Sequence, residues 1–305
     1  MYNKSKTETI GIILVLTGAA LWGMFPVFVN RGAKIIPPLI FAACSAMIAA
    51  IGSFVYLIKQ GKLFELKKRE SYFSLAMITL CIVVIPYSLF FIGASKTSGV
   101  NSSMLLLAEI IFTLIFTPFI GEKNTKYKIL GAGGIFAGAC FIMYNGTFTL
   151  NTGDILIILS TITYPIGNFY GKKVLNLISP SVILFVRFFF GGLFILTFSL
   201  MAERGINIGQ IIYNNWPLFI FNGLVLLGIS KILWYESLKR IDISKAVSLG
   251  MTFPLFSLII LIVYFNEKIS VYQGIGVAIM IIGVYYSIRR SSVDPKLTKY
   301  SPCKT

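Results

Sequence analysis

The chain has 305 residues, of which 56% are hydrophobic and only 12% are charged, and its formal net charge is +16. This composition excludes an ordinary soluble domain. The basic residues lie in short stretches between long apolar runs, so the charge indicates membrane topology and contact with anionic lipid rather than nucleic-acid binding. Histidine is absent, which removes the commonest general base and metal ligand. The composition predicts a polytopic helical membrane protein.

The apolar runs predict ten transmembrane helices, because about 20 apolar residues cross a bilayer as a helix. The first run has no small-residue cleavage site, so it is expected to stay in the protein rather than be removed as a signal peptide. The loops between the runs are too short to hold a soluble domain. The expected spans are 10–29, 38–58, 72–93, 98–120, 127–144, 153–170, 179–201, 216–237, 245–265 and 271–288.

The distribution of Lys and Arg predicts the orientation in the membrane. With a cytoplasmic N-terminus, 20 of the 27 basic residues fall on the cytoplasmic side, five fall on the other side, and Arg187 and Lys231 lie within spans. Short loops rich in Lys and Arg stay in the cytoplasm. Both termini are therefore expected to be cytoplasmic.

An internal repeat divides the chain into two halves. Aligning Glu122 with Glu267 also aligns Gly131 with Gly276 and Gly138 with Gly283, each pair being 145 residues apart. Each half has five spans, an odd number, so the second half must enter the membrane from the opposite side. The predicted fold is all-α, with ten transmembrane helices arranged as an inverted five-plus-five repeat and a site at the midplane between the halves. The predicted units are residues 1–148, residues 149–290 and a cytoplasmic tail, 291–305.

A second internal match pairs two prolines. Pro26 lies in Phe25-Pro26-Val27 and Pro165 lies in Tyr164-Pro165-Ile166. Proline-interrupted spans in corresponding places of two halves indicate a binding site. The alternative is that the prolines only kink helices around their neighbours. Asn30 and Asn168 lie just beyond the prolines, where they would satisfy freed backbone groups or bind solute.

Several motifs resemble those of a known family. They are Ala20-Leu21-Trp22-Gly23, Ala94-Ser95-Lys96-Thr97-Ser98, Gly121-Glu122-Lys123, Tyr235-Glu236-Ser237-Leu238-Lys239 and Asn266-Glu267-Lys268, together with the glycine-rich fifth and tenth spans. In these the chain resembles the drug/metabolite transporter superfamily, in particular its EamA-type ten-helix members. The resemblance covers nearly all of residues 8–290 and implies an inverted five-plus-five fold and export or exchange of small solutes. The halves differ in that Glu109 corresponds to Pro254, and Ser45 to Arg187.

Glu109 is the strongest candidate for a functional residue. It is expected about halfway along its span, where a charge is costly and usually functional. Ser102, Thr113 and Phe116 would share its helical face and form a polar stripe. The functional interpretation is a cation or proton site. The alternative is a structural pair with a lysine or a backbone group.

Arg187 and Lys231 are the basic residues within spans. Each is expected nearer the cytoplasmic end, so their side chains could snorkel to the interface. The alternative is that they bind a substrate carboxylate or pair with Glu109. Four aromatic residues are candidates to line a cavity or to form interface belts: Trp22, Tyr87, Tyr164 and Trp234.

The sequence contains no catalytic constellation and no GxxxxGK[ST] loop, so we expect no enzyme activity, ATP hydrolysis, cofactor or metal site. The leading interpretation is a secondary transporter that exports or exchanges amino acids or related metabolites across the bacterial inner membrane. Proton-coupled efflux of organic cations or drugs is the alternative, and Glu109 favours it. A membrane-embedded enzyme acting on lipid-linked groups is a third option, disfavoured by the lack of clustered acids. The expected partners of a monomeric chain are a small-molecule substrate and the lipid bilayer.

Overall fold

The computed structural model describes residues 2–120, 126–144, 150–203, 205–238, 240–241, 249–250, 252–266 and 270–288, which form helices and no strand. Within them, six helices are long and apolar enough to cross a membrane: Thr7–Gly32, Pro38–Lys59, Arg69–Ser95, Gly99–Phe116, Pro180–Ala202 and Ile208–Ser237. Three shorter apolar helices accompany them, at Ile129–Gly138, Phe253–Val263 and Val271–Gly283. The all-helical membrane fold is confirmed. The motifs at Gly121–Lys123 and Glu267–Lys268, and the tail, lie outside the described residues.

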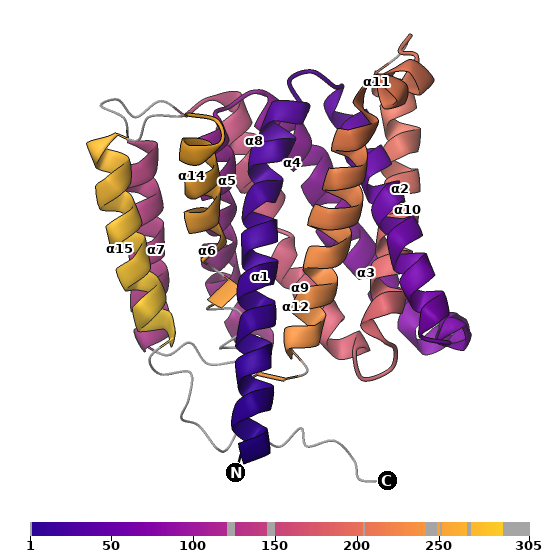
Figure 1. The fold of residues 1–305 in the computed structure, drawn as a ribbon, viewed down its shortest axis with the longest axis horizontal. Helices are drawn as coiled ribbons and strands as arrows, with labels where there is room; N and C mark the ends of the chain where they lie inside the picture. The colour runs from indigo at the N-terminus through magenta and orange to yellow at the C-terminus, as the bar shows by residue number, and fades with distance from the viewer. Residues whose placement is uncertain are drawn as a thin grey trace.

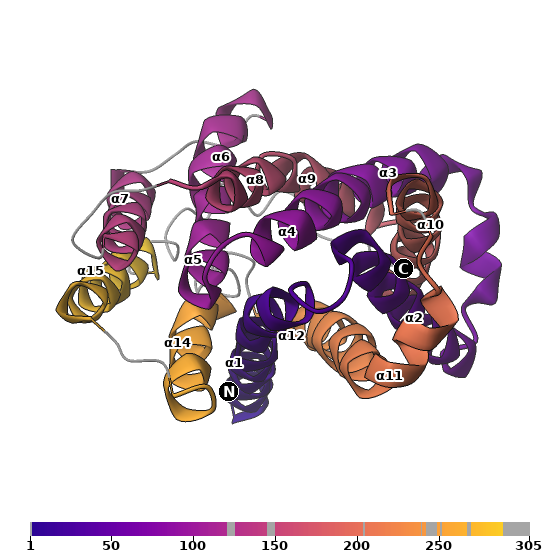
Figure 2. The same cartoon turned by 90° about the horizontal axis from the view of Figure 1, so that it is seen from above.

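The helices stand side by side along one common direction (Figure 1). We call the end at which α1 begins the near face, and the opposite end the far face. Seen from above, α7 and α15 lie together at one side of the bundle, and α2 and α10 lie near the other (Figure 2). The elements are α1 (Tyr2–Gly32), α2 (Pro38–Lys59), α3 (Tyr72–Ile78), α4 (Ile85–Ser95), α5 (Gly99–Met104), α6 (Ala108–Phe116), α7 (Lys126–Met143), α8 (Thr152–Thr161), α9 (Tyr164–Val174), α10 (Pro180–Ala202), α11 (Ile208–Ile220), α12 (Ser230–Leu238), α14 (Phe253–Val263) and α15 (Val271–Ile288).

The helices α2 and α10 cap each other's first turns with glutamates. The Glu203 carboxylate, just beyond the end of α10, accepts hydrogen bonds from the backbone N–H groups of Leu39 and Ile40 in α2, both at 3.1 Å. The Glu65 carboxylate, in the loop after α2, accepts one from the N–H of Ser179 at the start of α10, at 2.5 Å. Each carboxylate satisfies free backbone donors and faces the positive end of the helix dipole.

The helices α7 and α15 meet through glycines. A Cβ atom at Gly138 would lie 2.5 Å from the carbonyl oxygen of Gly276, and one at Gly283 would lie 2.8 Å from the carbonyl oxygen of Gly131. Only glycine allows two backbones to approach this closely. The two contacts are equivalent, because exchanging each glycine for its partner in the repeat turns the contact of Gly138 with Gly276 into the contact of Gly283 with Gly131.

Two local expectations are wrong. Pro26 lies inside α1, which runs unbroken from Tyr2 to Gly32, because loss of one helical N–H is tolerated there. Pro165, in contrast, lies at the start of α9, after a break that follows α8. The stripe around Glu109 is also broken, since the tighter 3₁₀ turn Leu105–Leu107 changes the helical register. Ser102 is accordingly buried while Thr113 is exposed.

The reciprocal caps predict a stability effect at both ends of the α2–α10 pair. Replacing Glu203 or Glu65 with Gln removes the charge and leaves a single acceptor oxygen, so each change should lower the free energy of unfolding by about 1–2 kcal/mol. The measurement is thermal unfolding of the purified protein in detergent. Glu70→Gln, at an exposed carboxylate of the same loop, is the control. If all three variants melt alike, the caps do not stabilise the helices.

Candidate functional site

A group of charged and aromatic side chains lies between helices from both halves of the chain. We call it the central cluster: Trp22 (α1), Tyr87 (α4), Glu109 (α6), Tyr164 and Asn168 (α9), Arg187 (α10) and Lys231 (α12). A hydrogen bond, a cation–π contact and charge interactions connect its members. The structure thus brings together seven of the residues that the sequence singled out.

Glu109 is held by an amide from the other half of the chain. The Nδ2 of Asn168 donates a hydrogen bond of 3.1 Å to the Glu109 carboxylate. Glu109 is half-buried and Asn168 is exposed, so protein does not fully enclose the pair. A carboxylate in this position can exchange a proton or bind a cationic group.

Lys231 stands over an aromatic ring. Its Nζ lies 3.2 Å from the centre of the Trp22 ring, a cation–π contact. It also lies within electrostatic range of both Glu109 and Arg187. The Trp22 ring in turn stacks on Phe25 at 4.5 Å between ring centres, which fixes the surface beneath the ammonium group.

Arg187 is buried, with only 3% of its surface exposed. Its guanidinium lies 4.6 Å from the centre of the Phe188 ring. Among the residues that the structure describes, its Nε and Nη2 atoms have no hydrogen-bond partner. The snorkelling alternative is therefore wrong for Arg187, because the side chain stays inside the bundle.

Two π-helical segments position members of the cluster. Thr79–Val84 precedes Tyr87, and Phe221–Ile229 precedes Lys231. Such segments are rare and frequent at functional sites, because they turn the following side chains relative to a regular helix. Pro86 follows the first segment and lacks the N–H that a regular helix would need there.

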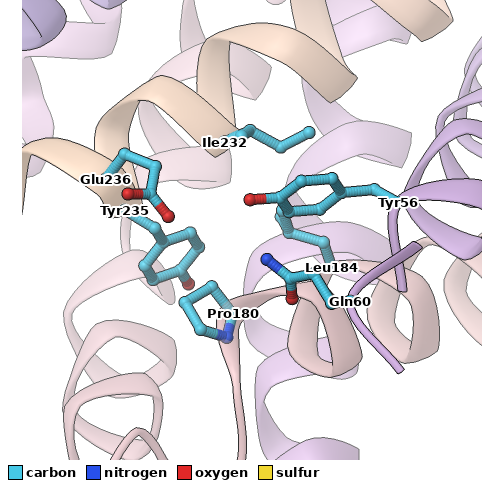
Figure 3. A pocket seen from close by; sticks show the side chains of 7 residues that line it. All are labelled: Tyr56, Gln60, Pro180, Leu184, Ile232, Tyr235 and Glu236. Atoms are coloured by element: carbon cyan, nitrogen blue, oxygen red, sulfur yellow. The ribbon is translucent and has the colours of Figure 1, made fainter. Parts of the chain in front are cut away.

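A small pocket lies between helices toward the near face. It is lined by residues of α2, α10 and α12 and of the turn after α2: Tyr56, Gln60, Pro180, Leu184, Ile232, Tyr235 and Glu236. In Figure 3 the Tyr56 hydroxyl and the Glu236 carboxylate point into the space from opposite sides. Lys231 lies about one helical turn deeper than Tyr235, and Arg187 nearly one turn deeper than Leu184. The two basic residues therefore lie deeper in the bundle than the residues that line the pocket.

A second cavity, of about 430 Å³, adjoins this pocket and shares Pro180 and Tyr235 with it. Its other lining residues come from the loop after α2 and the loop before α10, and they include Lys62 and Glu65. Together the two spaces form an opening on the near face.

A polar network joins the two halves at the far face. Asp154, fully buried at the start of α8, accepts hydrogen bonds from the Thr97 hydroxyl at 2.5 Å and from Asn101 Nδ2 at 3.1 Å. Asn30 donates to the carbonyl oxygens of Ala94 and Thr97, at 2.6 and 2.9 Å, and to the Ser102 hydroxyl. Asn30 and Ser102 thus belong to this far-face network rather than to the central cluster.

The remaining candidates lie elsewhere. Trp234 packs beside Gly250 and near Val15, on the α1 and α14 side of the bundle. Thr113 is exposed one turn beyond Glu109.

Sequence reasoning missed Asp154, although Asn151 three residues before it is a recognisable helix cap and the two form a capping box. It also missed Tyr56 and Gln60, which have no sequence signal of their own.

The comparison with protein families identifies the family of the chain. The profile of the EamA-like transporter family matches residues 9–144 and again residues 151–289. The chain belongs to the EamA-like transporter family. The family and the names of its relatives are those of membrane transporters rather than enzymes.

Relatives of this EamA protein extend over most of its length. The chain is 27% identical over 286 residues to the "Uncharacterized transporter YoaV" of Bacillus subtilis, covering 90% of this chain and 94% of that protein. It is 24% identical over 288 residues to an "Uncharacterized transporter" of Archaeoglobus fulgidus, covering 92% and 96%. The "Uncharacterized inner membrane transporter YedA" of Escherichia coli is 23% identical over 50% of each chain.

A solved crystal structure has the same fold. It superposes on this EamA protein with a TM-score of 0.71, covering 93% of this chain and 96% of the other, at 15% sequence identity. At this identity the likeness concerns the fold alone.

Proposed function

We propose that this EamA protein is a secondary transporter that exports or exchanges small metabolites, such as amino acids or related solutes, across a bacterial inner membrane. The observation that carries the proposal is the central cluster, where Glu109, Arg187 and Lys231 lie between helices of both halves. Charges within a membrane protein usually mark a solute or ion pathway. The opening on the near face and the polar closure on the far face fit one state of an alternating-access cycle.

We further propose ten spans in two inverted units, residues 1–148 and 149–290. The reciprocal contacts support this arrangement. Glu65 and Glu203 each cap the other half's helix. The contact of Gly138 with Gly276 becomes the contact of Gly283 with Gly131 when each glycine is exchanged for its partner in the repeat. A twofold axis between the halves would produce such exchange of roles.

The experiment is flux in proteoliposomes that contain the purified protein. Counterflow of a radiolabelled amino acid mixture and of single labelled organic acids should exceed that of protein-free vesicles. A matched control is protein with Arg187→Gln and Glu109→Gln together. If the parent protein gives no flux above empty vesicles for the whole panel, transport of these metabolites is refuted.

Proton-coupled efflux of organic cations is the second candidate. It is favoured by the half-buried Glu109 carboxylate, which accepts a hydrogen bond of 3.1 Å from the neutral Asn168 amide. Uptake of a labelled organic cation, driven by a pH gradient, would support this candidate.

The orientation can be tested by labelling single cysteines in whole cells. We propose that the near face and both termini are cytoplasmic, because 20 of the 27 Lys and Arg residues would then lie on that side. In a chain whose four cysteines are replaced by Ala, Lys67→Cys should stay unlabelled by a membrane-impermeant maleimide. Gln210→Cys, exposed at the start of α11, should react. The reverse pattern would invert the topology.

A further inference from the structure

Arg187 holds a permanent charge that its surroundings leave unpaired. The guanidinium is ionised under all physiological conditions. Within the described part of the chain, no carboxylate forms an ion pair with it, and its Nε and Nη2 atoms lack partners. A buried donor without a partner is costly, and more so when it is charged.

The unpaired atoms are arranged to hold an anion. Nε and Nη2 share one edge of the guanidinium, and their N–H bonds run parallel, which is the geometry that matches the two oxygens of a carboxylate. The Phe188 ring packs near the group, with its centre 4.6 Å from Cζ.

The residue equivalent to Arg187 in the other half of the chain has a hydrogen-bond partner. Ser45 corresponds to Arg187 when the halves are aligned on Pro38 and Pro180. The Ser45 hydroxyl accepts a hydrogen bond from Asn222 Nδ2 at 2.9 Å. The protein thus provides a hydrogen-bond partner for Ser45. The described residues provide none for the Nε and Nη2 atoms of Arg187.

The charges of the central cluster indicate how many negative charges the ligand carries. Glu109 and Lys231 lie within electrostatic range of each other. Their charges add to zero in the net charge of the cluster, whether or not a proton passes from one to the other. Arg187 leaves one positive charge. One negative charge on a bound molecule makes the cluster neutral, which low-dielectric surroundings favour.

We propose that Arg187 binds one anionic oxygen group of the transported solute, in the form of a carboxylate or a comparable monoanion, through Nε and Nη2. This inference rests on the proposed transport function and narrows its substrate class. It places the anionic group about one turn beyond the pocket of the near face. A solute without a negative charge leaves the Arg187 edge unpaired and binds weakly.

The test uses acetate, a small monocarboxylate that carries the proposed anionic group and little else. Acetate should raise the melting temperature of the detergent-purified protein in a saturable way, whereas acetamide, its neutral counterpart, should not. Arg187→Gln should weaken the apparent acetate affinity at least about tenfold, as expected for loss of a charge-assisted pair. Arg187→Lys, which keeps the charge without the fork, should lie between the two. Lys67→Gln, at an exposed lysine, is the control for non-specific salt effects.

The outcomes separate this proposal from the proposed function. Saturable acetate binding that Arg187→Gln removes and Lys67→Gln keeps supports the anion site. Equal acetate effects in the parent protein and Arg187→Gln, or no saturable effect in the parent, overturn it. Flux of metabolites in proteoliposomes together with either of these results would leave the transporter proposal intact and remove only the anion site.

Discussion

Replacing Gly138 with Ala is expected to destabilise the packing of α7 against α15. The new Cβ would lie 2.5 Å from the carbonyl oxygen of Gly276 and 2.8 Å from the backbone nitrogen of Met280. These neighbours are backbone atoms, so the whole helix must move to make room. We expect a loss of about 1–3 kcal/mol in the free energy of unfolding, the usual cost of overpacking.

The same helix offers a matched control. A Cβ atom added at Gly133 would point into open space, with no atom of another described helix within 4 Å. Gly133→Ala should be neutral or stabilise the protein by up to about 1 kcal/mol, since Ala favours helix over Gly. Thermal unfolding in detergent compares the two variants directly. Equal melting temperatures for Gly133→Ala and Gly138→Ala would show that the glycine contact does not support the pair.

The glycine pairing shows which part of the fold could be predicted from the sequence. The apolar runs located the helices because hydrophobic thickness sets their length. The match of Gly131 with Gly276 and of Gly138 with Gly283 identifies corresponding positions, but it does not predict that Gly138 contacts Gly276 and that Gly283 contacts Gly131. Contact between them is a property of the three-dimensional arrangement of the halves, and a pattern along the chain does not contain it.

The site could be predicted in part, and for a physical reason. Glu109, Arg187 and Lys231 stand out because charges within apolar spans are rare. Asn30 and Ser102 lie in the far-face network instead, because a buried amide or hydroxyl has the same sequence signal whether it binds solute or satisfies backbone groups. The break in the span of Glu109 was also hidden, since Leu105–Leu107 has an ordinary helical composition. Tyr56 and Gln60 were missed because only the packing of α2 against α10 and α12 places them at the pocket.

Replacing Glu109 with Gln is expected to reduce transport about tenfold or more while the protein stays folded. Gln keeps a carbonyl oxygen that can accept the hydrogen bond from Asn168, so the local geometry has a reason to persist. The carboxylate charge is lost, however, so the net charge of the central cluster rises from one positive charge to two. A monoanionic solute is then attracted by two positive charges rather than one in a low-dielectric region, so it is held more tightly and released more slowly. The measurement is the initial rate of counterflow in proteoliposomes, with Glu70→Gln as the exposed control.

A double variant distinguishes the two roles open to Glu109. Lys231→Met in addition to Glu109→Gln returns the cluster to the single charge of Arg187. If Glu109 serves to neutralise Lys231, the double variant should recover counterflow that Glu109→Gln alone has lost. If the carboxylate itself carries a proton or a cationic group, the double variant should stay inactive, and flux driven by a pH gradient should be absent from both. Unchanged counterflow in Glu109→Gln, with and without the gradient, would remove Glu109 from the transport site and leave Arg187 and Lys231 as its charged groups.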